Sequence, residues 1–227
     1  MQEPFDAGRR FNDRAPCYDT DIETIIPGYR ALHDGALHLL KTSIPVNARV
    51  LVAGSGTGNE LIGFAQENPG WRIHGFDIAR GMVDVARDKT ARLWLQSRVS
   101  FTHGRASDVF EDSFDAAVSL LVMHFLKGEE KADFLYELWL RLKPGGVLIL
   151  ADITGDRSAP VFETLLRAWE SFQLGQLEPE DVEKRIAFIR DGLPAISRHE
   201  TETLLETTGF TNVRLFHKSF LIEGTVS

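Results

Sequence analysis

Three glycines near residue 55 mark the segment of this sequence best suited to ligand binding. Gly54, Gly56 and Gly58 alternate directly after a short apolar run at residues 50–53. Glycine tolerates positive φ and lets a ligand approach the backbone closely, so the segment predicts a strand, a ligand-binding turn and a helix. An ordinary tight turn between a strand and a helix is the alternative interpretation.

An acid stands where the next strand of such a fold would end. Asp77 follows Gly58 by nineteen residues and comes directly after the predicted strand at 72–76. The ends of parallel strands meet at one edge of a sheet, where a carboxylate can accept hydrogen bonds from both hydroxyls of a ribose. Asp77 can also serve as the N-cap of the next helix, and the two roles are compatible.

The glycine spacing distinguishes between two kinds of adenosine cofactor. A dinucleotide site would have Gly-x-Gly-x-x-Gly, whereas this turn has Gly-x-Gly-x-Gly. Glu60 lies in the predicted first turn of the helix, where its carboxylate would repel a pyrophosphate. The sequence therefore favours an adenosine cofactor without phosphates.

Strands and helices alternate after residue 49, which predicts an α/β, Rossmann-like doubly wound sheet that is mostly parallel. The C-terminal part departs from this alternation, and we expect two inserted helices, a helix opened by a Ser197/Glu200 capping box, and an antiparallel hairpin. The predicted strands are 50–53, 72–76, 98–102, 114–119, 147–151, 212–217 and 220–226. The predicted helices are 29–41, 58–67, 79–89, 129–142, 159–174, 178–190 and the one from the capping box to residue 208.

The length of 227 residues suits a single α/β domain. We divide it into an N-terminal helical lid (1–45, with 11–18 irregular), a cofactor-binding core (46–155), a helical insertion (156–198), and a closing helix and hairpin (199–227). The inserted helices could form a homodimer surface.

Composition excludes several classes of function. The net charge is −8, which argues against a nucleic-acid partner. Cys17 is the only cysteine, so an internal disulfide and a thiolate zinc cluster are excluded. No apolar run is long enough to span a membrane, and residues 1–10 are polar, so we expect a cytoplasmic protein. The spacing of His, Asp and Glu predicts no metal site.

Taken together, these motifs resemble the class I S-adenosylmethionine-dependent methyltransferases over most of the chain. The resemblance is carried by VLVAGSGTG at 50–58, GFD ending at Asp77, Ser107-Asp108, FDAAVSLLVMHFL at 114–126 and LKPGGVLIL at 142–150. It implies that the cofactor S-adenosylmethionine, or its product S-adenosylhomocysteine, contacts Gly54, Ser55, Gly56, Asp77, Ile78, Asp108, Val109, Ser119 and Leu120.

Within that resemblance, Asp77 would bind the ribose and Asp108 the exocyclic amine of adenine. The family often has an acid two residues before the first glycine, where this sequence has Val52. The ammonium of the cofactor would then be held by backbone carbonyls near Gly54, Ser119 and Leu120.

A weaker resemblance connects the chain with carboxy-S-adenosylmethionine synthase and its methyltransferase relatives. It lies in IIPGYRALH around Tyr29, in the helix that holds Arg185, and in residues 196–210. It implies that Tyr29 contacts the cofactor and Arg185 the transferable group, although Tyr29 also suits a core and Arg185 a surface ion pair. The synthase has an Asn where this chain has Leu120, which argues for a methyl donor, and Arg185 could then hold an anionic substrate.

Methyl transfer to oxygen or nitrogen can require a base, and His124, directly after the fourth predicted strand, is the candidate catalytic residue. A packing or helix-capping histidine is the alternative, while His33, His199 and His217 are expected at the surface. Tyr18 and Trp169 could stack on a flat substrate, although Trp169 also fits a core-facing stripe.

The sequence therefore predicts an enzyme that methylates an O or N atom of a small-molecule acceptor. A carboxy-S-adenosylmethionine synthase-like enzyme and a non-catalytic cofactor-binding module are the alternatives. Neither a membrane nor a nucleic acid is expected as a partner.

Overall fold

The structure is a computed structural model that describes residues 6–227, so the first five residues of the predicted lid lie outside it. Its strands are hydrogen-bonded in the order β3-β2-β1-β4-β5-β7-β6. They are β1 (Arg49–Ala53), β2 (Arg72–Asp77), β3 (Val99–His103), β4 (Phe114–Leu120), β5 (Leu142–Ile153), β6 (Arg214–Ser219) and β7 (Ile222–Val226). β1 pairs in parallel with β2 and β4, and β7 pairs antiparallel with β5 and β6. The predicted mostly parallel sheet with a C-terminal antiparallel hairpin is confirmed.

Nine α-helices accompany these strands in residues 6–227. They are α1 (Ala7–Arg14), α2 (Tyr18–Ile25), α3 (Tyr29–Ser43), α4 (Asn59–Glu67), α5 (Arg80–Arg92), α6 (Glu129–Arg141), α7 (Phe162–Leu174), α8 (Pro179–Ala187) and α9 (Arg198–Thr208). The expectation that 11–18 is irregular holds only for the turn at 15–17, because residues 11–14 belong to α1 and Tyr18 begins α2. Asp6 caps α1 by accepting a hydrogen bond from the Arg9 amide at 3.1 Å. No helix in this range has the length and apolar character needed to cross a membrane.

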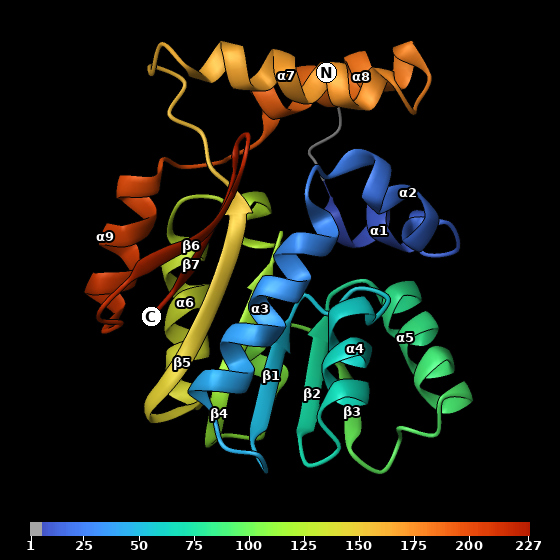
Figure 1. The fold of residues 1–227 in the computed structure, drawn as a ribbon, viewed down its shortest axis with the longest axis vertical. Helices are drawn as coiled ribbons and strands as arrows, with labels where there is room; N and C mark the ends of the chain where they lie inside the picture. Colours follow the sequence, from blue (N-terminus) through green and yellow to red (C-terminus); the bar gives the residue numbers. More distant parts are fainter. Residues whose placement is uncertain (1–5) are drawn as a thin grey trace. The chain divides into compact units, whose positions relative to one another are not determined.

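The chain divides into two compact units. The first contains the described residues up to Asp19, together with Leu37–Ser119 and Leu140–Leu148. In it α4 contacts β2, and α5 contacts β2, β3 and α1 (Figure 1). Trp71 is buried in this unit, and its Nε1 donates to the Pro45 carbonyl oxygen at 3.1 Å. The polar groups described below lie at or just after the carboxyl ends of β1 to β3.

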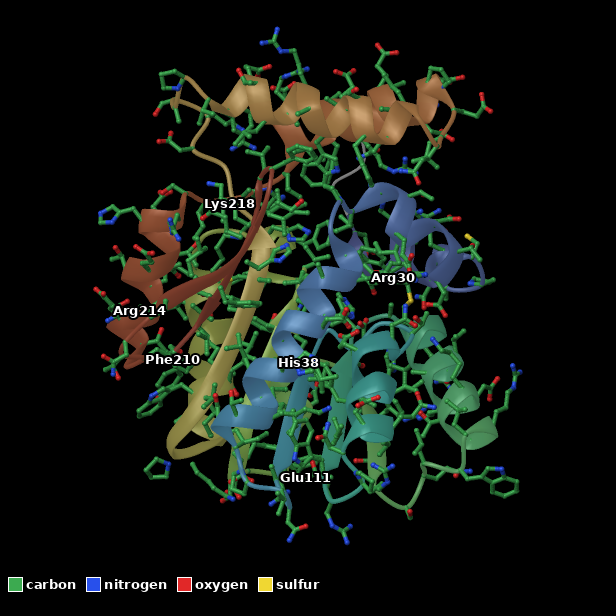
Figure 2. The ribbon with its side chains drawn as sticks, viewed as in Figure 1. Arg30, His38, Glu111, Phe210, Arg214 and Lys218 are labelled. Atoms are coloured by element: carbon green, nitrogen blue, oxygen red, sulfur yellow. The ribbon has the colours of Figure 1, made fainter. Side chains whose placement is uncertain are left out.

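The second unit consists of Thr20–Ala36, Leu120–Trp139 and Ile149–Ser227. The β6–β7 hairpin has Arg214 and Lys218 toward opposite ends of β6 (Figure 2). α7 packs against α8. Trp169 of α7 has no exposed surface, and its Nε1 donates to the Ile25 carbonyl oxygen at 2.7 Å. The inserted helices are thereby joined to the end of α2.

Candidate functional site

The glycine turn between β1 and α4 adopts backbone conformations that favour glycine. Gly56 and Gly58 have φ of +50° and +81°, in the left-handed region. A Cβ on Gly58 would lie 3.2 Å from the Ala86 Cβ, so the helix–helix approach also needs a glycine. A Cβ on Gly56 would meet no heavy atom within 4 Å, which leaves open space over that part of the turn.

Asp77 connects the glycine turn to the end of β2. One carboxylate oxygen accepts the Gly56 amide at 2.9 Å, and the other accepts the Ala79 amide at 2.8 Å at the start of α5. Burial raises the pKa of Asp77, although both backbone bonds act in the opposite direction. Each oxygen keeps a second lone pair, so the carboxylate can still accept hydrogen bonds from a ligand's hydroxyls.

The tip of β3 lies beside the tip of β2. The Gly104 amide donates to the Asp77 carbonyl oxygen at 2.9 Å, and Asp108 accepts the Arg105 amide at 2.8 Å. Asp108 is exposed, whereas Val109 is buried and its carbonyl accepts from Arg141 at 3.0 Å. An exposed carboxylate and an apolar neighbour at this tip suit the edge of a purine.

Two serines at the strand ends are buried and differ in orientation. The Oγ atoms of Ser55 and Ser119 have no hydrogen-bond partner among the described residues. A Cβ on Gly75 would lie within 3 Å of the Ser55 side chain, so Ser55 packs on β2, and its backbone amide donates to the Phe76 carbonyl oxygen at 2.9 Å. Ser119 ends the part of β4 in this unit and pairs in register with Ala53. Its unpaired hydroxyl marks a place where a polar ligand group would be stabilised.

Residues of the N-terminal helices α1 and α2 make polar contacts with the glycine turn and with α5, and the sequence did not indicate these contacts. The Asp19 carboxylate accepts hydrogen bonds from the Thr57 hydroxyl and from Lys89 Nζ, the latter at 2.7 Å. Burial acts to raise the pKa of Asp19, but the bonds from Lys89 and Thr57 outweigh it and hold it below its ordinary value. The Asn12 side chain accepts the Gly81 amide at 2.7 Å.

Tyr18 lies in this N-terminal segment. Burial raises the pKa of its phenol, and the charges of Glu60 and Asp77 act in the same direction. Its ring meets Phe11 edge-on, with the centroids 6.3 Å apart. Tyr18 is thus placed beside the groups of the glycine turn, as its predicted role near a ligand requires, and its contact with substrate stays a prediction.

In the second unit, His124 and Asp152 form a buried pair. His124 lies on a 3-10 turn, Met123–Phe125, after β4, and Asp152 lies near the end of β5. One Asp152 oxygen lies 2.5 Å from His124 Nδ1 and also accepts the His124 backbone amide at 3.0 Å. Lys131 Nζ donates to the Met123 carbonyl oxygen at 2.7 Å, which fixes the turn. The sequence did not indicate Asp152 as a site residue, because it lies near the end of an apolar strand and 28 residues away from His124.

Leu120 and Tyr29, both predicted cofactor contacts, are buried in the same unit. The ring of Tyr29 lies 4.1 Å from that of His33. The expectation that His33 is a surface residue was wrong, since its side chain is half-buried, and this burial lowers its pKa to about 4. The expectation also failed for His217, which is half-buried, whereas His199 is exposed as expected.

The two other predicted substrate residues occupy different environments. Trp169 is fully buried and hydrogen-bonded to the backbone, which is the position of a core residue and matches the alternative interpretation of its stripe. Arg185 is half-buried on α8, and its neighbour Lys184 pairs with Glu180 at 2.7 Å. No group of three or more His, Cys, Asp or Glu among residues 6–227 is arranged to hold a metal ion.

The first unit fits an adenosine cofactor that carries an amino acid and no phosphates. Open space above Gly56, the unpaired hydroxyl of Ser119 and the free lone pairs of Asp77 are suited to such a ligand. Glu60 is buried in the first turn of α4, where it would oppose a pyrophosphate. The residues present therefore agree with the cofactor expected from the sequence.

Residues 51–148 match the family model described as "Methyltransferase domain". This match identifies a methyltransferase domain in residues 51–148. Together with the strand order and the glycine turn, it agrees with the predicted class I S-adenosylmethionine-dependent methyltransferase and with the S-adenosylmethionine cofactor expected from the sequence.

Among proteins of assigned function, the chain is similar to carboxy-S-adenosylmethionine synthases. It is 23% identical to that of Desulfotalea psychrophila over 92% of this chain and 87% of the relative. It is 25% identical to that of Alteromonas mediterranea over 91% and 86%.

Solved structures share the fold. Magnesium protoporphyrin IX methyltransferase from Synechocystis, solved with S-adenosylhomocysteine, has a TM-score of 0.64 and 18% identity over 90% of this chain and 85% of that one. A Nostoc punctiforme protein assigned as an O-methyltransferase has a TM-score of 0.69 and 17% identity over 95% of this chain, which spans only 59% of that protein.

Proposed function

We propose that this protein transfers a methyl group from S-adenosylmethionine to an oxygen or nitrogen atom of a small-molecule acceptor, with His124 as the general base. The observation that carries the proposal is the buried His124–Asp152 pair on the segments that follow β4 and end β5. A histidine held in this way suits proton removal from a hydroxyl or an amine.

The carboxylate of Asp152 determines which nitrogen of His124 is basic. If Nδ1 carries the proton and donates it to Asp152, the lone pair is left on Nε2, and that atom takes the acceptor's proton. Leu121, with φ of +64° and an amide that donates to the Ala151 carbonyl at 2.7 Å, begins the tight turn that carries the histidine. A strained backbone held by such bonds is typical of a functional turn.

In the first unit, the chain's own groups would bind and orient the cofactor. Asp77 would accept the ribose hydroxyls, the exposed Ile78 would contact the adenine, and Asp108 would accept from its amine. The backbone of residues 54–56 and the Ser119 hydroxyl would hold the amino-acid end. When bound, the cofactor supplies a methyl group on a positively charged sulfur, and Tyr18 would present an aromatic ring to that charge.

A carboxy-S-adenosylmethionine synthase-like activity is the second candidate, favoured by the relatives described above. Arg185 would then bind a carboxylate on the group transferred. Leu120 disfavours this candidate because it is an apolar, buried residue where the synthase resemblance implies an asparagine. In the methyltransferase, Arg185 would hold an anionic part of the acceptor.

Mass spectrometry of the ligand that copurifies with the protein distinguishes these candidates. Unmodified S-adenosylmethionine or S-adenosylhomocysteine is expected, together with methyl transfer from labelled cofactor to phenols, amines or heterocycles. His124→Asn should abolish the transfer while cofactor affinity in calorimetry is retained. Recovery of a cofactor heavier by one CO₂ would favour the synthase, and tight binding without turnover on any acceptor would leave a binding module.

A further inference from the structure

Glu60 is a buried acid at the centre of the cofactor-binding edge. It is the second residue of α4, directly after the glycine turn, and only 8% of its surface is exposed. A carboxylate near a helix N-terminus is favoured by the backbone dipoles, yet burial favours its neutral form. Its expected opposition to a pyrophosphate apart, no role in binding the cofactor has been assigned to this side chain.

The groups that interact electrostatically with Glu60 come from three elements. Asp77 lies at the end of β2, Lys89 on α5, and Tyr18 and Asp19 on α2. Burial is the principal cause that raises the pKa of Glu60, to about 7. Asp77 and Asp19 act in the same direction, and Lys89 and the backbone amide of Glu60 act against it.

Most of these neighbours are already committed to hydrogen bonds. Lys89 Nζ lies 2.7 Å from an Asp19 oxygen and 2.6 Å from Asn59 Oδ1, so its charge is largely taken up by Asp19. Asp77 accepts two backbone amides. Glu60 is therefore the acid of this cluster whose charge is most easily changed by a ligand.

We propose that Glu60 discriminates the cationic cofactor S-adenosylmethionine from its product S-adenosylhomocysteine, by losing its proton when the first binds and keeping it when the second binds. The inference rests on the proposed function. It concerns specificity, and it assigns to Glu60 no contact with the acceptor.

Charge explains the discrimination. S-adenosylmethionine carries one more positive charge than S-adenosylhomocysteine, on its sulfur. A cation bound across the turn favours the ionised carboxyl, and the ionised carboxyl in turn favours the cation to the same extent. Glu60 releases a proton to solvent as the cofactor binds. After methyl transfer the sulfur is a neutral thioether, and Glu60 regains its proton. The attraction between the carboxylate and the sulfur charge is then lost, so the product is bound less tightly.

Isothermal titration calorimetry in two buffers of different ionisation enthalpy tests this directly. At pH 7, close to the pKa of about 7, the wild-type protein should release a substantial fraction of a proton per S-adenosylmethionine and close to none per S-adenosylhomocysteine. The ratio of their affinities should shift several-fold toward S-adenosylmethionine between pH 6 and pH 8, about tenfold for each unit by which the ligand lowers the pKa.

Glu60→Gln should remove both effects, because the amide keeps the shape and cannot titrate. Glu67→Gln, on the exposed end of the same helix, is the matched control and should behave like the wild type. The measurement on the wild-type protein can contradict the inference by itself. The inference therefore stays testable even if Glu60→Gln folds poorly.

Three results would overturn the inference alone: binding of S-adenosylmethionine without proton release, equal release for both ligands, or release that persists in Glu60→Gln. If neither ligand binds at any pH, the proposed function fails, and this inference fails with it.

Discussion

One oxygen of Asp152 lies 2.5 Å from the ring Nδ1 of His124 and accepts a hydrogen bond from the His124 backbone amide at 3.0 Å. The same carboxylate thus restrains both the position and the rotation of the histidine. The contact with the backbone amide fixes the turn and the contact with Nδ1 fixes the ring, so each of these two polar atoms of His124 has one partner on the same carboxylate.

We predict that Asp152→Asn lowers kcat by at least about tenfold, because the amide can present a donor to Nδ1 and reverse the tautomer of His124. The KM for the acceptor and the affinity for S-adenosylhomocysteine should change far less. Steady-state kinetics and calorimetry measure the two effects. Asp133→Asn, exposed on α6, is the control. Equal losses in kcat and in cofactor affinity would contradict a positioning role.

Removal of the Asp77 carboxylate should weaken cofactor binding. Asp77→Ala loses the acceptor for the ribose hydroxyls, and bonds to a charged acceptor contribute about 1.5–3 kcal/mol each, so the affinity for S-adenosylhomocysteine should fall at least about tenfold. Asp84→Ala, in an exposed ion pair on α5, should leave the affinity unchanged. An unchanged affinity in Asp77→Ala, measured by calorimetry, would remove Asp77 from the site.

The contacts of Asp19 with Thr57 and Lys89 should slow ligand exchange. Asp19→Ala is expected to speed dissociation of S-adenosylhomocysteine several-fold in stopped-flow displacement, with Asp13→Ala, exposed on α1, as the control. Since the pKa of Asp19 is lowered on folding, its stabilising effect is present at neutral pH and is lost as pH falls through that lowered pKa. The melting temperatures of Asp19→Ala and wild type should therefore converge in acid below about pH 4.

The ligand-free protein should become less stable as its buried acid ionises. The pKa of Glu60 rises from 4.5 to about 7 on folding, so the folded state binds more protons than the unfolded state in that interval, and stability falls as pH rises through it. Glu60→Gln lacks this loss. The difference between its melting temperature and that of the wild type should therefore increase, in favour of the variant, by about 2 °C or more from pH 5 to pH 8. A constant difference in thermal scans would contradict the burial of an ionisable carboxyl.

Local chemistry made much of the first unit predictable. The glycine turn, the following helix and the acid at the end of β2 are set by interactions within short segments, because glycine conformations and strand ends depend on neighbouring residues. The length of β5 was not predicted. It begins at Leu142 and includes Pro144–Gly146, where a turn was expected, although Gly145 has a φ of +77° that departs from extended backbone.

Contacts between distant segments could not be predicted. The pairing of His124 with Asp152 depends on how far each strand extends, and the pairing of Asp19 with Thr57 depends on where α2 packs. For Trp169, a helical repeat of apolar residues showed only that one face is covered. That pattern is the same for a core and for a substrate-binding surface, so only the three-dimensional arrangement distinguishes them.

The two buried indoles give each compact unit a fluorophore of its own. Trp71 emits from the interior of the first and Trp169 from the interior of the second, while Trp94 is 86% exposed and open to a quencher such as acrylamide. Paired Trp71→Phe and Trp169→Phe proteins in which Trp94 and the partly exposed Trp139 are also replaced by Phe, followed during denaturation, would therefore reveal whether the two units melt in one cooperative transition or in succession.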